Sequence, residues 1–228
     1  MSDTAWIANL LQLSDTFYPT GSYAHSFGLE GLVQDGLVRD RASLREFLLE
    51  QALPALAQTD LIVAAAAWAA AGEPADLETI AQLCTLGSAL RGAREPREAS
   101  DAIGRQRLDL LAKRPQASAL VRALQARGGS TPSSVIAAIE ARAIGAPVEA
   151  ALSALIYAAA AGLLAAAVKL LRLGQNAVQS LLTEALAGAP DLIASALATP
   201  LAEAGAFTPW WDMAAARHER ADFRLFIS

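Results

Sequence analysis

The sequence predicts an all-α protein, a single-domain helical bundle of roughly ten helices. No stretch of the chain shows sustained apolar/polar alternation with β-branched enrichment, as strands would require. Proline and glycine instead punctuate the chain about every 15 to 25 residues, which suits helices joined by short loops. The 228 residues are 54% apolar and 18% charged, a composition that fits one packed core and excludes a disordered chain.

The N-terminal part begins with a short helix and a loop. We expect a first helix over residues 4–13 and a loop over 15–23, because Pro19 and Gly21 forbid helical continuation. A second helix is expected to start near His25.

A long helix follows the second one. Ser43 and Glu46 fit a capping box at its start, and the apolar pattern continues through Trp68. Pro54 lies inside this pattern and lacks a backbone donor, so we expect a kink or an interruption there.

The rest of the chain reads as a series of helices. Asp76 is expected to cap a helix that ends near Arg91. Residues 94–113 form a helix with charges of alternating sign, which is either solvated or an electrostatic contact. Further helices are expected at 117–126, 132–144, 147–173, 176–187 and 191–198.

The uncharged segment 150–168 has about the length that spans a bilayer. More than half of it is alanine, which contributes little insertion energy, and its larger apolar residues follow helical spacing. We therefore expect a buried helix of a soluble protein. Its small residues let another helix approach closely, so it is either the central core helix or a subunit interface; these residues are Ala158, Ala161, Gly162 and Ala165.

Charge and cysteine content narrow the functional class. A formal charge of -5 and a pI near 5.1 argue against binding to nucleic acid. Cys84 is the single cysteine, which excludes a disulfide framework and favours a cytoplasmic setting. Residues 1–13 lack the basic region and cleavage site of a secretory signal.

The chain offers little catalytic or metal chemistry. Its only histidines are His25 and His218, and Ser22 with His25 imitates a nucleophile and base without an elbow motif or an oxyanion hole. No two histidines share a helix face and no cysteine pair exists, so we expect no stable metal site. The chain is expected not to be an enzyme.

The two ends of the chain have unusual compositions for termini. We expect the N-terminal segment 1–24 and the C-terminal tail 207–228 to be docking ends for partner proteins. The tail carries large apolar side chains that must be buried on the protein's own core or on a partner: Trp210, Trp211, Phe223, Leu225 and Phe226. The tail is expected to order only on binding.

Four blocks of the sequence, in order, resemble the urease accessory protein UreF family. The first is LLQLSDTFYPTGSYAHSFGLEGLVQDGLV at 10–38, and the next two are GAREPREASDAIGRQRL and AAAVKLLRLGQNAVQSLL. The fourth is the tail TPWWDMAAARHERADFRLFIS, which departs from the family pattern at Asp222, Phe223 and Ile227. We transfer no docking role to these three residues. The first block also departs, with Ser22 where the family has a second glycine.

The resemblance implies an accessory protein that works by assembly. Such a protein is an all-helical homodimer that binds UreD (also called UreH), recruits the GTPase UreG and helps nickel to reach apo-urease. It has no cofactor, because nickel is handled only by the assembled complex. The partner-binding residues implied are Tyr23, Ser26, Glu30, Lys169, Arg217, His218, Glu219, Arg224, Leu225 and Phe226. The dimer interface implied includes Tyr157, Ala158 and Ala161.

Three alternatives remain open at this point. Lys169 and Arg172 lie three residues apart and could supply the cationic finger of a GTPase-activating protein that acts on UreG. Their simpler role is to complement the negative end of a helix dipole. A helical hydrolase using Ser22 and His25 and a membrane-surface protein using 150–168 are the other two.

Overall fold

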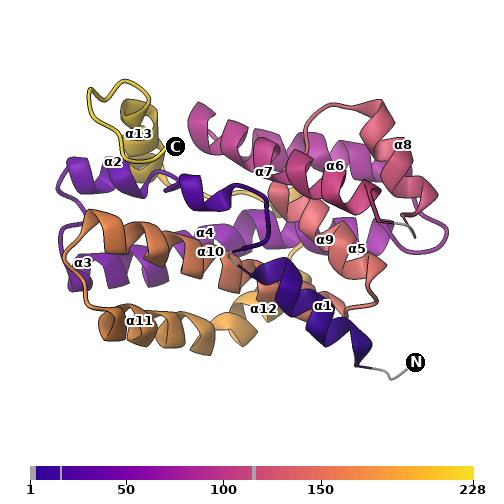
Figure 1. Ribbon diagram of the computed structural model, residues 1–228, viewed down its shortest axis with the longest axis horizontal. Helices are drawn as coiled ribbons and strands as arrows, with labels where there is room; N and C mark the ends of the chain where they lie inside the picture. The colour runs from indigo at the N-terminus through magenta and orange to yellow at the C-terminus, as the bar shows by residue number, and fades with distance from the viewer. Residues whose placement is uncertain (1–3, 16, 115–116) are drawn as a thin grey trace.

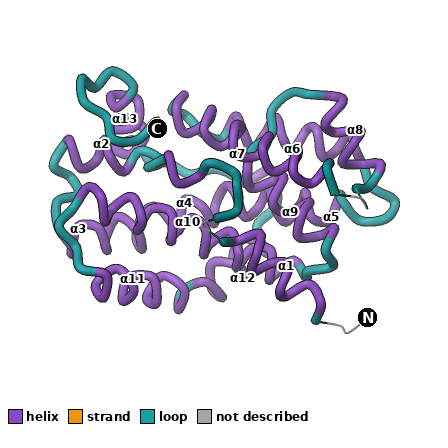
Figure 2. Tube along the Cα trace, in the orientation of Figure 1, coloured by secondary structure: helices purple, strands orange, loops and turns teal. Residues whose placement is uncertain are grey.

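The computed structural model describes residues 4–15, 17–114 and 117–228. Every regular element in these ranges is helical, which confirms the all-α prediction (Figures 1 and 2). With Arg41–Ala70 counted as one helix, and Gln175–Ala198 as one helix bent at Gly188, the described residues form ten helices of six residues or more. The predicted number is therefore correct.

The elements of the first third are α1 (Ala5–Ser14), the 3-10 turn η1 (Ser22–Ala24), α2 (Leu29–Gln34), α3 (Arg41–Glu46), η2 (Phe47–Ala52), α4 (Leu53–Leu56), η3 (Ala57–Leu61) and α5 (Ile62–Ala70). The elements that follow are α6 (Leu77–Ala89), α7 (Arg94–Ala112), α8 (Ala119–Arg127), α9 (Ser133–Ala143), α10 (Val148–Leu170), α11 (Gln175–Ala187), α12 (Ala189–Ala198), η4 (Leu201–Glu203) and α13 (Pro209–His218).

Two predicted helix starts are wrong. The second helix begins at Leu29 rather than near His25, because Phe27 and Gly28 have φ angles of 52° and 86°, outside the right-handed helical region. The long helix is capped by Asp40 rather than Ser43. Asp40 Oδ1 accepts from the Ser43 amide at 2.9 Å, and Ser43 Oγ accepts from the Asp40 amide at 3.1 Å, so Ser43 is the third helical residue of the capping box.

The long helix continues past Pro54 without a break. The α-helical turn Leu53–Leu56 is flanked by the π-helical turns Phe47–Ala52 and Ala57–Leu61. Because proline removes one backbone donor and crowds the preceding turn, local widening of the helix is a physical alternative to a kink. The predicted kink or interruption at Pro54 is therefore wrong, because the helix changes its winding on both sides of this turn and stays continuous.

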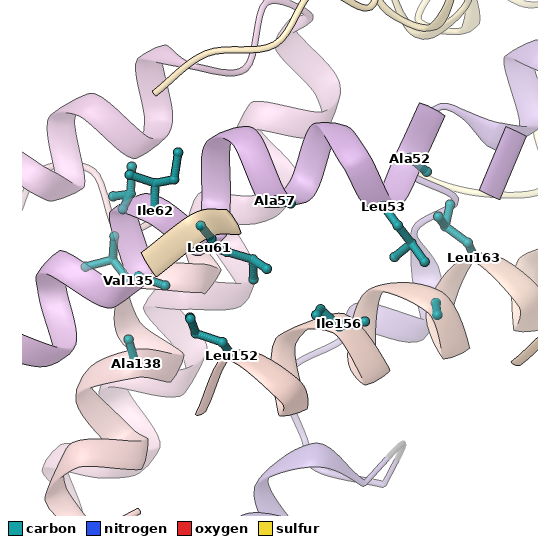
Figure 3. Packing of buried hydrophobic residues seen from close by; sticks show 14 of the residues in the cluster. Ala52, Leu53, Ala57, Leu61, Ile62, Val135, Ala138, Leu152, Ile156 and Leu163 are labelled. Atoms are coloured by element: carbon teal, nitrogen blue, oxygen red, sulfur yellow. The ribbon is translucent and has the colours of Figure 1, made fainter. Parts of the chain in front are cut away.

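Helix α10 is the central helix of the core. It contacts α9, α11, α1, α12 and α2. Figure 3 shows Leu152, Ile156 and Leu163 of α10 among the buried side chains, on the side that faces the α3–α5 helix. Segment 150–168 was predicted to be either the central core helix or a subunit interface. The face of α10 that carries these buried residues confirms the core role.

Three helical stretches are long and apolar enough to cross a membrane by length and composition: Arg41–Ala70, Val148–Leu170 and Gln175–Ala198. All three stretches contact one another, and Leu152, Ile156 and Ala160 of α10 are fully buried. Of the most apolar window of each stretch, 44, 44 and 28% is buried, so packing within the bundle uses only part of their apolar surface.

The two ends of the chain pack in different places. Trp6 and Leu10 of α1 lie against a small cluster formed by Ala141, Ala146 and Ala151. Helix α13 packs on α2 and α7 instead, well away from α1 (Figure 1). Residues 1–3 and 16 of the predicted N-terminal docking segment lie outside the described residues.

Candidate functional site

The C-terminal tail folds back onto the block that precedes and forms α2. The indole Nε1 of Trp211 donates to the Phe27 carbonyl at 2.7 Å, and its ring meets Phe47 edge-on with centroids 5.1 Å apart. A Cβ atom at Gly31 would lie 2.4 Å from the Ala214 carbonyl oxygen. The absence of a side chain at Gly31 therefore lets α13 approach α2 closely (Figure 1).

Glu30 is the buried acceptor at the centre of this contact. It is 2% exposed, and its carboxylate accepts from the main-chain amides of Leu225 and Phe226 at 2.8 and 3.0 Å. The same carboxylate faces His218 Nε2 at 2.9 Å. A buried carboxylate needs several donors to offset its lost hydration, and Glu30 obtains all three from the tail.

Glu95, at the start of α7, holds the tail from the opposite side. Its carboxylate lies 2.9 Å from His218 Nδ1 and 2.5 Å from Arg224 Nη1. The preceding residue, Arg94, forms an ion pair with Glu219. The sequence suggested an electrostatic contact for α7 but assigned no site residue to it, so Glu95 was missed. The only signal was that the charges of the block around Arg94 complement those of the tail.

The chain terminus is anchored beside η1. The Ser26 amide and hydroxyl donate to the Ser228 main-chain oxygen at 2.5 and 2.8 Å, and the Ile227 amide donates to the Ala24 carbonyl at 2.9 Å. His25 Nδ1 lies 2.8 Å from Ser228 Oγ. Burial lowers the pKa of His25, and the charge of Glu95 partly opposes this shift.

The hydrolase alternative gains no support from this geometry. The hydrogen-bonding partner of His25 is Ser228, and no side-chain hydrogen bond joins Ser22 to His25 in the described ranges. Cys84 is buried, which raises the pKa of its thiol to about 12, so it is a poor nucleophile. Among the described residues, no three His, Cys, Asp or Glu side chains are grouped so that they could hold a metal ion.

The ten residues assigned to partner binding gather at this end of the molecule. Four of them are buried inside the contact between the tail and the N-terminal block: Ser26, Glu30, His218 and Phe226. In this arrangement they cannot touch a partner, and they hold the tail from within. Partner binding through the remaining six stays a prediction; these are Tyr23, Lys169, Arg217, Glu219, Arg224 and Leu225.

Two of the cationic residues, Lys169 and Arg217, contact Phe226 and Asp35. Lys169, at the end of α10, places its Nζ 5.1 Å from the centre of the Phe226 ring. Arg217 pairs with Asp35 at 2.9 Å. Lys169 is exposed as well as in contact with the tail, so the role of a cationic finger stays a prediction.

The exposed side of the site is apolar. Tyr23, Phe223, Leu225 and Ile227 are 73, 78, 52 and 63% exposed, and we call these four residues the tail face. Phe226 and Ser228 point inward, so outward and inward side chains alternate along the last residues. Phe223 and Ile227 were excluded from the sequence prediction because they depart from the family pattern.

A small hollow lies between α13 and the loop that follows α2. Its volume is about 210 Å³, and it is lined by Asp35, Leu37, Trp210, Met213 and Arg217. Trp210 is 65% exposed at this hollow, although Trp211 beside it is packed. The apolar surface of this end therefore extends beyond the tail face.

The expectation that the tail orders only on binding stays a prediction, although its premise differs from the structure. It assumed that a short terminal segment lacks enough burial of its own. The structure instead gives His218 and Phe226 buried positions within the chain, with Glu30 and Glu95 as their charged and polar neighbours.

The predicted dimer residues lie on the outer part of α10. Tyr157 is 37% exposed, Ala158 is exposed and Ala161 is half-buried. An exposed tyrosine beside small residues is compatible with a subunit contact. The interface itself stays a prediction.

Comparisons with known proteins identify the family. The UreF family model matches residues 38–186. The urease accessory protein UreF of Paenarthrobacter aurescens (strain TC1) is 33% identical over an alignment of 238 positions that covers both chains completely. Its counterparts from Granulibacter bethesdensis and Azoarcus sp. (strain BH72) are 33 and 35% identical, covering 98 and 97% of this chain and 94 and 95% of their own lengths. The chain belongs to the UreF family of urease accessory proteins.

Proposed function

We propose that this protein is a non-enzymatic scaffold for urease maturation whose tail face docks the accessory protein UreD (UreH). One observation carries the proposal: four large apolar side chains are exposed at this end of the molecule, three of them on a tail segment that hydrogen bonds and ion pairs hold in place. Interface hot spots are typically aromatic or large apolar anchors presented in a defined geometry. A fixed tail also loses less conformational entropy on binding than a disordered one.

The other parts of the proposal follow from the family. UreG joins the complex, and nickel reaches apo-urease within the assembly, so this chain needs no resident cofactor. The relatives are named urease accessory proteins, which supports a role in urease maturation. We expect a cytoplasmic homodimer that pairs through the face of α10 carrying Tyr157, Ala158 and Ala161.

The proposal is tested by substitutions in the exposed tail face that leave the buried contacts of the tail unchanged. Leu225→Asp and Ile227→Asp place a charge in the tail face, while the inward-pointing Phe226 keeps its position. We expect each variant to weaken UreD binding by about 30-fold or more, as at other hot spots. Binding is measured by titration calorimetry with purified UreD, and circular dichroism verifies the helical fold.

Leu197→Asp is the matched control, because Leu197 is 42% exposed on α12, outside the tail site. It should bind UreD like the unmodified chain. If both tail-face variants kept full affinity, the docking assignment would be wrong. Truncation after Pro209 is a less specific test, since it also uncovers the buried residues Leu29 and Glu30.

A further inference from the structure

A second hollow lies where the start of α1, the end of α5 and the turn between α9 and α10 meet. Its volume is about 550 Å³, and Trp6, Trp68 and Arg142 line it together with Thr4 and the turn 145–147. This volume lies in the range of roughly 300–1,000 Å³ that is typical of ligand sites. None of these residues belongs to the tail face or to the predicted dimer residues, so the hollow has no part in the proposed docking of UreD.

The aromatic walls of the hollow are fixed by contacts within the chain. Trp6 and Trp68 both pack against the small cluster of Ala141, Ala146 and Ala151. The indole Nε1 of Trp68 donates to the Ala146 carbonyl at 3.0 Å, so the polar atom of this ring already has a partner. Trp68 therefore offers apolar ring surface in a defined orientation, which lowers the entropic cost of binding a ligand.

Arg142 supplies the positive charge of the hollow. Its guanidinium carbon lies 4.0 Å from the centre of the Trp68 ring. Gly72 leaves room for it, since a Cβ atom there would lie 3.0 Å from Arg142 Nη2. Among the described residues, Arg142 forms no ion pair and its side chain donates no hydrogen bond. This half-buried arginine is thus held over an indole while the described residues leave its donors unused.

A simpler role for Arg142 is to complement the negative end of the α9 dipole, because it lies in the last turn of that helix. That role needs only a charge near the helix end, and it does not account for a guanidinium held over an indole at the wall of a hollow. Guanidinium donors lie in one plane and match the two oxygens of a carboxylate. The hollow therefore combines a receptor for a carboxylate with apolar walls.

We infer that this hollow binds an acidic side chain of a partner protein together with a neighbouring apolar side chain. Arg142 holds the carboxylate, and Trp6 and Trp68 hold the apolar group. Charge complementarity selects the acid, and the indole surfaces select its neighbour. The choice of a protein segment as the ligand rests on the proposed function, which is assembly. The hollow and the tail face are nevertheless separate surfaces.

The first experiment titrates the full chain, labelled with ¹⁵N at tryptophan, with the dipeptide N-acetyl-Phe-Glu-amide. Trp6 and Trp68 line the hollow, whereas the other two tryptophans, Trp210 and Trp211, lie in α13. We expect the dipeptide to shift the indole signals of the first pair and to leave those of the second pair unchanged. Absence of a shift at Trp6 and Trp68 would overturn the inference.

Two further probes define what the hollow recognises. N-acetyl-Phe-Gln-amide has the same shape without the charge, so its affinity should be lower by about 10-fold or more. Equal affinities of the two dipeptides would overturn the role of the carboxylate. Phenylacetate is a free acid without a peptide backbone, and we expect it to bind more weakly than the charged dipeptide. Tighter binding of phenylacetate would assign the hollow to small acids and overturn the choice of a protein segment.

Arg142→Gln tests the arginine itself. We expect the affinity for the charged dipeptide to fall by about 10-fold or more and its advantage over the neutral dipeptide to disappear. Arg142→Lys keeps the charge without the planar donors and should have an intermediate affinity. Arg105→Gln is the matched control, because Arg105 is exposed on α7 and does not line the hollow. Unchanged affinity in Arg142→Gln would refute the inference, and circular dichroism verifies the fold of each variant.

The inference and the proposed docking of UreD can fail separately. Leu225→Asp changes the tail face and lies outside the hollow, so this variant should bind the dipeptide like the unmodified chain. Weakened UreD binding in Leu225→Asp, with no dipeptide binding in any form of the chain, would remove the inference alone. Dipeptide binding that depends on Arg142, with full UreD affinity in both tail-face variants, would remove the tail docking and leave the hollow as a binding site.

Discussion

At the scale of single residues, two glycines set the geometry of the contact between the tail and α2. A Cβ atom at Gly28 would lie 2.7 Å from Trp211 Nε1, and Gly28 also has a φ of 86°. Gly31 lies in α2 and has an ordinary helical conformation. Glycine is needed there only because the Ala214 carbonyl occupies the space that a side chain would fill. Both residues lie in the first block of family resemblance, and the structure shows what that motif packs against.

Gly31→Ala should therefore displace α13. We expect the free energy of unfolding to fall by about 1–3 kcal/mol, as for overpacked cores, although alanine favours helix formation. Urea unfolding measures the loss, and amide exchange at Trp211 and Phe226 should report a loosened tail. Gly162→Ala is the control in α10, where an added Cβ meets nothing within 4 Å. If Gly31→Ala were as stable as this control, close packing would not be what requires glycine.

The residues of the site show what sequence could and could not reveal. The family resemblance selected Glu30 and His218, yet it assigned them to partner contact, and the structure buries both. Their contact joins positions 188 residues apart, and no local pattern specifies such a pairing. Glu95 was missed for the same reason. Charged residues in a helix read as a solvated face unless the opposite charges that cover them are known.

At the scale of elements, local signals located most helices well. Asp76 caps α6 as predicted, with Oδ1 accepting from the Thr79 amide at 3.0 Å, and α7 begins at Arg94 as expected. The predicted start of α2 is wrong because the left-handed backbone at Gly28 prevents the helix from beginning earlier. Capping side chains and breakers act over a few residues, so sequence can show them. The path of the tail depends on tertiary contacts.

The end of α1 is anchored by a buried polar group. Arg107 of α7 pairs with the fully buried Glu140 of α9 at 2.6 Å and donates to the Leu13 carbonyl at 3.1 Å. Tyr18 donates to the same carboxylate at 2.8 Å. Burial, together with the charge of Glu140, raises the pKa of Tyr18 to about 12. This tyrosine therefore stays protonated and remains a donor at physiological pH.

Glu140→Gln should be the more damaging change in this anchor. It leaves Arg107 without a compensating charge in the interior, and we expect a loss of about 3–5 kcal/mol in the free energy of unfolding. Tyr18→Phe removes one hydrogen bond to a charged group and should cost about 1.5–3 kcal/mol. Urea unfolding of the two variants gives the comparison. A smaller loss for Glu140→Gln than for Tyr18→Phe would contradict the primary role of the ion pair.

At the scale of the whole molecule, apolar residues lie both in the core and on the surface. The inner face of α10 packs in the core, and burial within the bundle covers less than half of the apolar window of each of the three long apolar helices. Apolar residues remain exposed at the tail face and on the outer part of α10 around Tyr157. Exposed apolar surface of this kind indicates protein contacts. The docking end and the predicted dimer face are separate sets of residues, so they can be changed independently.

Tyr157→Glu should separate the subunits and leave the tail site intact. A charge in a desolvated interface cannot be compensated, so we expect the variant to sediment as a single 23.7 kDa chain where the unmodified protein sediments at twice this mass. Leu186→Glu is the matched control, because Leu186 is also 37% exposed but lies on α11. Sedimentation equilibrium at micromolar concentration measures the mass, and UreD binding tests the tail. A monomeric unmodified protein, or a dimer of Tyr157→Glu, would show that α10 is not the subunit interface.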